Sequence, residues 1–314
     1  MLAYIFKRIL MTVPVMAVVA LFVFLMLRLS PGDPASVIAG DYATAEDIAR
    51  IRENLGLNKP ILVQFWNWLW QLLGGDLGIS IFTNLPVTTL IAQRLEPTLL
   101  LALTTILFTL VVAVPLGTIA AWKQGSLIDR GVMLFSVAGF SVPVFVLGYI
   151  LIYVVAIQLK LLPVQGYKSP FIDGLWPFLR HIILPTVTLS VIYIALIARM
   201  TRASVMEVLQ EDYVRTARAK GQSEFKVLMK HALRNAAVPI VTVVGLGIAL
   251  LIGGVVVTES VYNIPGLGRL VLDAVLKRDY PIIQGLILLF SFIYILINLL
   301  IDLAYTVFDP RIRY

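Results

Sequence analysis

The polar run RMTRASVMEVLQEDYVRTARAKGQSEFKVLMKHALRNAAVP, residues 199–239, lies between two strongly apolar stretches. In its first half, apolar and small residues recur at the i, i+3, i+4 spacing of one helix face, namely Val205, Val208, Leu209, Tyr213, Thr216 and Ala217. Glu211 and Arg215 are spaced as an i, i+4 ion pair outside that face. The pattern predicts one amphipathic helix.

Gly221 interrupts this helix, and a second short helix is expected after it. Ser223 is a candidate N-cap, Glu224 follows in the first turn, and the apolar spacing resumes at Phe225, Leu228, Met229 and Ala232. Another face is lined by Lys226, Lys230 and Arg234. Two amphipathic helices that meet at a glycine, held at both ends by apolar segments, indicate a surface presented to a soluble partner.

The composition of the chain is that of an integral membrane protein. Of its 314 residues only 14% are charged, against roughly 25% in soluble domains, and the mean hydropathy is +0.93. The chain has no cysteine, which excludes disulfides and thiolate metal sites. It has no phosphate-binding loop and no H-E-x-x-H pattern, so any nucleotide chemistry must come from another chain. His181 and His231 lie in different segments, and we expect ordinary polar contacts from them rather than a metal site.

Six apolar stretches are long enough to cross a membrane as helices, which takes about 20 residues. The first, residues 9–29, has a signal peptide as its alternative, but it is longer than the roughly 7–15 apolar residues of such a peptide and ends in RLSPGDP. The others cover about residues 98–122, 132–159, 182–198, 238–258 and 282–307. Prolines inside them predict helix kinks, with hinges of a moving bundle as the alternative: Pro115, Pro143, Pro185 and Pro239.

The region after the first span is expected to lie outside the membrane, because charges, glycines and prolines return there. Its residues 61–73 are too short to span and hold three tryptophans, Trp66, Trp68 and Trp70, which predicts a helix in the membrane interface. Six spans put both termini on one side, where lysine and arginine are in excess. The positive-inside rule makes that side cytoplasmic, and it explains the net charge of +7 without nucleic acid.

The predicted fold is therefore an all-α membrane protein with three parts. Residues 1–30 form the cytoplasmic N-terminal end and the first span. Residues 31–96 form an external helical insertion. Residues 97–314 form the core, with a cytoplasmic two-helix loop over residues 199–237, between the fourth and fifth spans.

Two motifs in the polar run carry a resemblance to a known family. DYVRTARAKG at 212–221 and HALRNAAVP at 231–239 resemble the cytoplasmic loop of ABC-importer permeases, in the version of peptide and nickel transporters. The general loop reads Glu-Ala-Ala, three residues, Gly, nine residues, Ile-x-Leu-Pro, and only Ala217, Gly221 and Leu233 match it. The departures resemble those of the peptide-permease subfamily.

Seven further motifs, in the same order along the chain, are similar to this family: PGDP (31–34), LGLNKP (55–60), GDLGIS (75–80), HIILP (181–185), PGLGRL (265–270), RDYPIIQG (278–285) and DPRIRY (309–314). The long region after the first span resembles the first of the two permeases in importers of the dipeptide, glutathione and oligopeptide type.

The resemblance implies a permease subunit in the bacterial inner membrane. Its partners are expected to be a related second permease, two cytoplasmic ATPase subunits that bind ATP and Mg, and an external substrate-binding protein. The chain itself then needs no cofactor and no catalytic residue. The expected cargo is a peptide or a peptide-like solute such as glutathione, with nickel or another small solute as the alternative.

The resemblance also implies which residues couple the permease to the ATPase, with a merely solvated charged face as the alternative. They are Asp212, Tyr213, Arg215, Thr216, Ala217, Arg218, Ala219, Lys220, Gly221, His231, Arg234 and Asn235.

Three polar residues in or near the spans are candidates for the solute pathway or for helix packing. Asn298 and Asp302 are spaced i, i+4 in the last span, and packing is the favoured reading of that pair. Glu259, just outside the fifth span, could face the binding protein or the pathway. A self-sufficient secondary transporter or channel is the alternative of a different class. The scarcity of ionisable residues in the spans argues against it, and a membrane-embedded enzyme lacks a cluster of catalytic groups.

Overall fold

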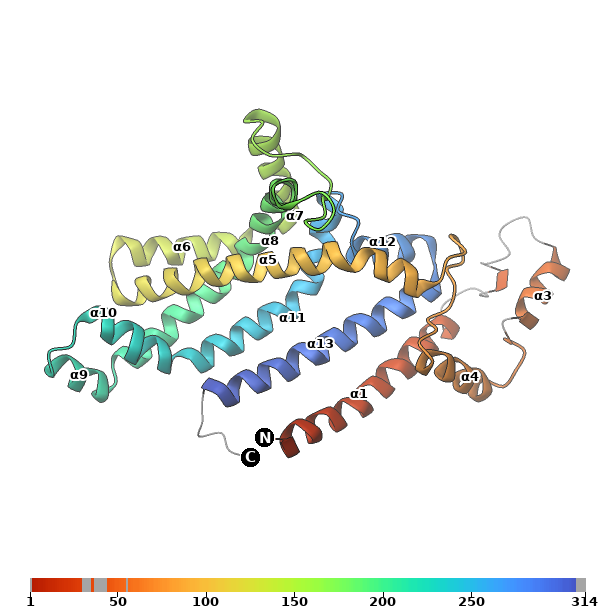
Figure 1. Ribbon diagram of the computed structural model, residues 1–314, viewed down its shortest axis with the longest axis horizontal. Coiled ribbons are helices and arrows are strands. Elements are labelled where there is room, and N and C mark those ends of the chain that lie inside the picture. Colours follow the sequence, from red (N-terminus) through yellow and green to blue (C-terminus); the bar gives the residue numbers. More distant parts are fainter. Residues whose placement is uncertain (1, 30–34, 37–43, 55, 309–314) are drawn as a thin grey trace. The chain divides into compact units, whose positions relative to one another are not determined.

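The computed structural model describes residues 2–29, 35–36, 44–54 and 56–308. Within these ranges the chain is helical, and its only extended pairing is an isolated antiparallel bridge between Ile79 and Pro86 (Figure 1). Leu55 and the motifs PGDP and DPRIRY lie outside the described residues. Apolar segments become helices because a helix satisfies its own backbone hydrogen bonds without water.

The helices are α1 (Leu2–Leu29), α3 (Ala45–Asn54), α4 (Ile61–Leu73), α5 (Val87–Trp122), α6 (Leu127–Ser141), α7 (Val144–Leu151), α8 (Leu175–Leu209), α9 (Asp212–Ala219), α10 (Glu224–Lys226), α11 (Ala237–Val261), α12 (Leu267–Lys277) and α13 (Tyr280–Phe308), with the π-helices η1 (Ile152–Gln158) and η2 (Val227–Leu233). Four of them are long and apolar enough to cross a membrane: α5, α8, α11 and residues Tyr280–Leu303 of α13. A bent pair of helices makes a fifth if it counts as one span, and α1 contributes a shorter apolar stretch, Leu10–Met26.

The span expected over residues 132–159 is broken at Pro143, one of the positions where a kink is predicted, and the bend is sharp. The segments Leu127–Ser141 and Val144–Gln158 meet at an angle of 103°. Pro143 explains the break, because proline cannot donate a backbone hydrogen bond and it disfavours helical backbone in the residue before it. Val142 accordingly takes an extended conformation, with φ −93° and ψ 120°.

α8 is longer than the predicted span over residues 182–198. Its 35 residues run through Pro185 to Leu209, so the first part of the polar run continues the apolar helix instead of starting a new one. The helix-compatible sequence between residues 199 and 209 contains neither glycine nor proline, and nothing there stops the helix.

The chain divides into two compact units, residues 1–95 with 270–296 and residues 96–269 with 297–314. In the first unit α4 packs on α1. The buried Phe24 ring lies edge-on to Phe65, with 5.1 Å between centroids, and 5.6 Å from the Trp68 ring. Trp66 and Trp70 remain 56% and 68% exposed. The amphipathic helix thus turns one tryptophan inward and two outward.

Two of the quoted motifs meet in the same unit. Ser80 of GDLGIS donates a hydrogen bond of 2.6 Å to Oδ2 of Asp279 in RDYPIIQG, and the backbone N–H of Ile81 donates to Oδ1. Asp279 is only 2% exposed. A buried carboxylate needs such donors, so these contacts fix the loop before α5 against the start of α13.

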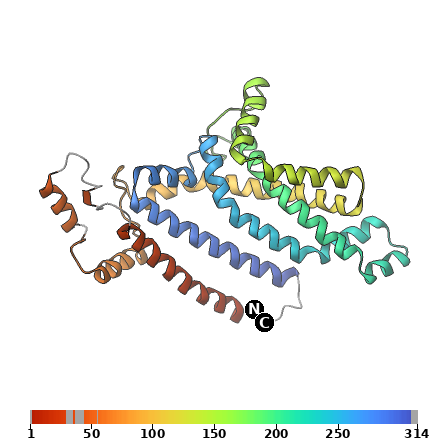
Figure 2. The ribbon, with the colours of Figure 1, turned by 180° about the vertical axis from the view of Figure 1, so that it is seen from behind.

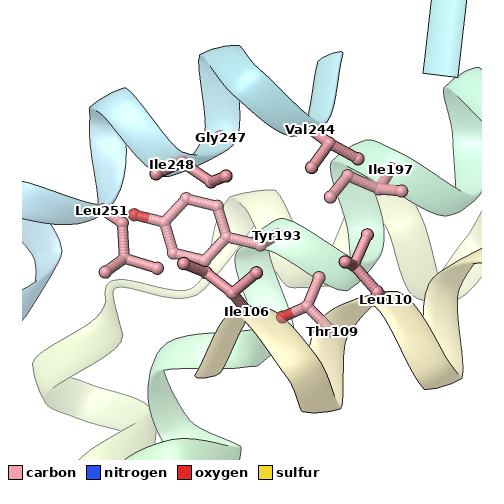
Figure 3. Close-up of a pocket in the computed structure, with 9 residues that line it drawn as sticks. All are labelled: Ile106, Thr109, Leu110, Tyr193, Ile197, Val244, Gly247, Ile248 and Leu251. Carbon is pink, nitrogen blue, oxygen red and sulfur yellow. The ribbon is translucent and has the colours of Figure 1, made fainter. Parts of the chain in front are cut away.

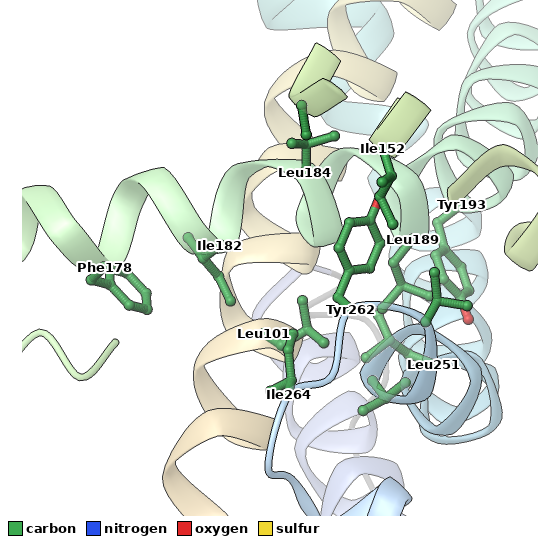
Figure 4. Close-up of a cluster of buried hydrophobic side chains, with 13 residues drawn as sticks. Leu101, Ile152, Phe178, Ile182, Leu184, Leu189, Tyr193, Leu251, Tyr262 and Ile264 are labelled. Carbon is green, nitrogen blue, oxygen red and sulfur yellow. The ribbon is translucent and has the colours of Figure 1, made fainter. Parts of the chain in front are cut away.

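The second unit has its main apolar core where α5, α7, η1, α8 and α11 converge (Figure 4). Tyr262, 2% exposed, lies at its centre, and its hydroxyl is 2.6 Å from Thr188 Oγ1 and donates to the Gly148 carbonyl at 3.4 Å. The hydrogen bonds satisfy the phenol inside an apolar core, as buried tyrosine requires.

Candidate functional site

The polar run forms a helical hairpin that continues α8 on one side and α11 on the other (Figures 1 and 2). We call residues 210–236 the hairpin. Its first arm is α9, and its second arm is α10 followed by η2. Gly221 lies between the arms with φ +76°, a left-handed conformation that glycine adopts without strain, and a Cβ built there meets nothing within 4 Å. The predicted bend at Gly221 is present.

The first arm is not part of one long amphipathic helix. α8 ends at Leu209, and α9 starts at Asp212 after an extended Glu211, with φ −67° and ψ 145°. Glu211 therefore stands outside the helix that carries Arg215, and the predicted i, i+4 ion pair does not form. Arg215 lies instead 3.6 Å from Asp212.

This break also changes which side chains face inward. Val214 and Ala217 are buried, at 0% and 6% exposure, whereas Tyr213 and Thr216 of the predicted apolar face are exposed. The buried face of α9 is thus an i, i+3 pair within that helix. It does not continue the buried face of α8, although the sequence pattern predicts one continuous face.

The second arm buries only part of the predicted face, namely Leu228 and Ala232 but not Phe225 or Met229. Its wider π-helical turns shift the inward side of the arm. Val227, Leu228 and Ala232 are buried, while Phe225 and Met229 are 72% and 44% exposed. Two large apolar side chains that were expected in the core therefore lie on the surface.

Two apolar clusters fix the hairpin to the helices. In the smaller one, Val214 and Ala217 of the first arm pack with Val227 of the second. The larger one joins both long helices and the end of α5: Ala121, Val205, Leu228, Ala232, Ala236 and Ile240. The hairpin is therefore packed directly against α5, α8 and α11.

Polar contacts hold the two arms in register. Arg218 donates to both oxygens of Glu224 across the turn, at 2.9 and 3.3 Å. His231 Nε2 lies 2.9 Å from Gln222 Oε1, and its carbonyl accepts a hydrogen bond of 2.7 Å from Asn235. His231 thus makes the ordinary polar contact predicted for it, and so does His181, whose Nδ1 is 2.7 Å from the Pro177 carbonyl.

The predicted cap at Ser223 forms only in its backbone. Ser223 occupies the N-cap position with extended geometry, but its side chain makes no capping hydrogen bond.

The outer face of the hairpin carries most of the predicted coupling residues. Ala217 is buried and His231 is half-buried, and the others are exposed: Asp212, Tyr213, Arg215, Thr216, Arg218, Ala219, Lys220, Gly221, Arg234 and Asn235. The hairpin contains six basic and three acidic residues. Tyr213, Phe225 and Met229 add exposed aromatic and apolar surface to this basic face.

Glu259 lies away from the hairpin, near the end of α11, and is 0% exposed. Its carboxylate accepts a 2.5 Å hydrogen bond from the Thr98 hydroxyl and a 3.0 Å bond from the backbone N–H of Arg269, in the first turn of α12. Thr98 in turn accepts a bond of 2.8 Å from the N–H of Leu267. The two side chains together cap the start of α12, an arrangement that favours helix packing over a pathway.

The other two polar candidates lie one turn apart near the end of α13. Asn298 is exposed and Asp302 is half-buried. Asn298 lies on an exposed side of the last long helix.

A small cavity of about 10 Å³ lies among α5, α8 and α11. Tyr193 projects between Ile106 and Thr109 on one side and Gly247 and Ile248 on the other (Figure 3). This volume is enough for about one water molecule and excludes a peptide.

Sequence reasoning missed one partly buried ion pair beside the hairpin. Arg202 of α8 pairs with Asp129 in the first turn of α6. The two residues are 73 positions apart in the chain, and no local pattern connects them.

Comparison with known proteins places the chain in a family. The family described as binding-protein-dependent transport system inner membrane component matches residues 113–314, and the N-terminal family of the same kind of membrane component matches residues 1–102. The chain belongs to this family of transport components. The permease is accordingly a multi-pass protein of the inner membrane and a subunit of an ABC importer.

Curated relatives are similar to the permease along its whole length. The probable peptide ABC transporter permease protein y4tP of Sinorhizobium fredii is 58% identical over 311 residues, 99% of both chains. The glutathione transport system permease protein GsiC of Escherichia coli is 46% identical over 314 residues, 100% of both chains.

The fold of the permease is also that of a solved transporter subunit. A chain from inward-facing crystal structures of the MetNI methionine ABC transporter superposes with a TM-score of 0.58 at 17% identity. The match covers 71% of the permease and 97% of that chain.

Proposed function

We propose that the permease carries peptides or peptide-like solutes into the cytoplasm, as one of two related permeases in an ATP-driven importer. The relatives at 58% and 46% identity, named for peptide and glutathione transport, support this cargo over nickel or another small solute. Glutathione is itself a small peptide, so both names point to one chemical class.

The proposed topology has six spans with both termini in the cytoplasm. Four long helices, the bent pair as a fifth span and the 28-residue α1 as the sixth support that number. A spanning helix needs about 17–25 predominantly apolar residues, and the apolar stretch Leu10–Met26 of α1 lies at the short end of that range. Six spans would put the hairpin and both termini on one side, and the basic charge of the hairpin makes that side cytoplasmic by the positive-inside rule.

In this topology residues 31–96 form an external insertion, and residues 97–314 form the permease core. The exposed Trp66 and Trp70 support an interfacial position for α4, because indole rings favour the headgroup region.

One observation supports the coupling role above all: the hairpin has two different faces. The inner face is packed into α5, α8 and α11, while the outer face combines basic side chains with the exposed Tyr213 and Phe225. Aromatic and arginine side chains are the ones that most often dominate binding energies at interfaces. We assign this outer face to a cytoplasmic ATPase subunit with an acidic or neutral docking surface.

The permease then contributes no catalytic residue of its own. ATP and Mg bind in the two partner ATPases, and an external substrate-binding protein delivers the solute. The hairpin couples two conformational states of the importer rather than a chemical step.

The test is uptake into proteoliposomes assembled from purified subunits. The complete importer, with its binding protein outside and ATP inside, is expected to accumulate radiolabelled glutathione or a labelled dipeptide. Omission of the ATPase or of ATP is expected to abolish uptake. Uptake by this chain alone, driven by an ion gradient, would show a secondary transporter instead.

A further inference from the structure

The ion pair between Asp129 and Arg202 has tightly defined geometry. Arg202 donates from Nε to Oδ1 and from Nη2 to Oδ2 of Asp129, the second bond measuring 2.8 Å. The side chains of the aspartate and the arginine are 5% and 21% exposed. Oδ2 also accepts a bond of 2.9 Å from the N–H of Gly125, in the turn between α5 and α6. Such a two-pronged pair fixes orientation as well as distance.

The pair lies close along the chain to two members of the cluster that holds the hairpin. Arg202 precedes Val205 of that cluster by three residues on α8. Gly125 follows Ala121, the α5 member of the cluster, by four residues. The pair therefore lies where α5, α6 and α8 meet next to the hairpin.

Close contacts bring the three helices together farther along. A Cβ built at Gly117 of α5 would lie 2.4 Å from the carbonyl oxygen of Ala198 in α8. A Cβ built at Gly139 of α6 would lie 3.0 Å from the Cβ of Ala195 in α8. Close packing thus joins α5 to α8 and α6 to α8, and the ion pair is a second contact between α6 and α8.

We propose that Asp129 and Arg202 are positioning residues for transport, which lock α6 to α8 so that movement of the hairpin reaches α6 and the bend at Pro143. This inference rests on the proposed coupling function. In this proposal α8 and α6 move with the hairpin, and the ion pair holds the bent pair of helices to α8.

The choice of variant separates a role in transport from a role in stability. An ion pair removed from water is often no more stabilising than apolar side chains of the same volume, whereas loss of one partner leaves an unpaired charge in the protein. The informative variant therefore removes both charges together, as Asp129→Asn with Arg202→Gln. Arg130→Gln is the matched control, because Arg130 is the exposed neighbour on α6.

The experiment uses the complete importer in lipid nanodiscs and proteoliposomes. Spin labels at Leu134→Cys on α6 and Glu207→Cys on α8 report the distance between the helices, and this chain has no cysteine of its own. Distances are compared without nucleotide and with ATP and vanadate. Uptake of labelled glutathione per ATP hydrolysed reports coupling, and co-purification of the ATPase reports assembly.

We expect the same α6–α8 distance in both nucleotide states for the wild type and for Arg130→Gln. In the double variant we expect a broad or nucleotide-dependent distance and about a tenfold loss of uptake per ATP, with the ATPase still bound. Wild-type uptake per ATP in the double variant would overturn the proposal and leave hairpin docking intact. Absence of ATP-dependent uptake in the wild type would instead contradict the proposed function.

Arg202→Lys covers the case in which the double variant does not assemble. It keeps the charge but loses the two-pronged geometry. We expect assembly with about a threefold loss of uptake per ATP. Full coupling in this variant would also overturn the proposal.

Discussion

Glu259 shows at the scale of one residue how a charged group is accommodated in this fold. The carboxylate is fully buried, and two glycines of the PGLGRL motif make room for it. A Cβ at Gly266 would lie 2.1 Å from its Oε1, and one at Gly268 would lie 2.6 Å from the Cα of Val256. The motif is glycine-rich because the chain must pass directly over a carboxylate that caps the next helix.

Gly266→Ala is expected to destabilise the permease by about 2 kcal/mol, because the added methyl group overlaps the Glu259 carboxylate. Gly253→Ala is the matched control. Its Cβ meets nothing within 4 Å in the middle of α11, so a gain of up to about 1 kcal/mol is expected from helix propensity. Thermal unfolding of both purified variants checks this, and equal midpoints would refute the close approach.

Truncation of Glu259 tests the cap itself. Glu259→Ala leaves the Thr98 hydroxyl and the Arg269 N–H without their acceptor, which is expected to cost about 3 kcal/mol. Glu259→Gln retains one acceptor oxygen and is expected to lose about half as much. If thermal unfolding shows that Glu259→Ala and Glu259→Gln are equally stable, and solute uptake is lost in both variants, Glu259 belongs to the pathway.

Local sequence patterns predicted some of these residue contacts and not others. The bend at Gly221 was visible because glycine is the residue that takes a positive φ. The Thr98–Glu259 contact joins residues 161 positions apart, and Asp129 and Arg202 are 73 apart. Such pairs depend on how whole helices pack, which no local spacing encodes.

At the scale of elements, the hairpin turns its aromatic side chains outward. Phe225→Ala is expected to leave stability within about 0.5 kcal/mol, because the ring is 72% exposed. We expect it to weaken ATPase binding by about 2 kcal/mol, the effect of losing an aromatic anchor. Binding of purified ATPase to permease pairs in nanodiscs measures this.

Phe171→Ala is the control for that measurement, since Phe171 is 80% exposed but lies outside the hairpin. It is expected to bind the ATPase like the wild type. Equal weakening by both variants would argue against docking through the hairpin.

Gly221→Pro tests the turn between the arms. Proline requires φ near −65° and has no N–H, whereas Gly221 has φ +76° and donates a bond of 2.9 Å to the Arg218 carbonyl. Substrate-dependent ATP hydrolysis is expected to be lost in this variant. Gly221→Ala costs only the strain of a positive φ, about 1 kcal/mol. This variant should retain most of the substrate-dependent ATP hydrolysis.

The outline of the hairpin could be predicted from the sequence, but only part of its inward face could: Ala217, Leu228 and Ala232 are buried as predicted. The break between α8 and α9 falls at Gln210 and Glu211, in a stretch without glycine or proline. The π-helical turn of η2 likewise has no local signature. The break changes which residues of α9 are buried, and the π-helical turn changes which residues of η2 are buried, so that Met229 was expected inside and lies outside.

At the scale of the whole molecule, hydropathy predicted an all-α membrane protein, and the fold agrees with that of a solved ABC-transporter chain. The proline positions predicted where helices could bend, but not the size of the bend. Pro143 breaks its segment by 103°, while α8 continues through Pro185. The difference depends on whether neighbouring helices satisfy the carbonyl that proline leaves free.

The central claim is that the outer face of the hairpin contacts the ATPase, and photocrosslinking tests it most directly. A photoreactive phenylalanine analogue replaces Tyr213 or Phe225 in the assembled, active importer, with position 171 as the control. The account predicts a covalent adduct with the ATPase from positions 213 and 225 and none from position 171. An active importer that forms no ATPase adduct from either hairpin position would contradict it.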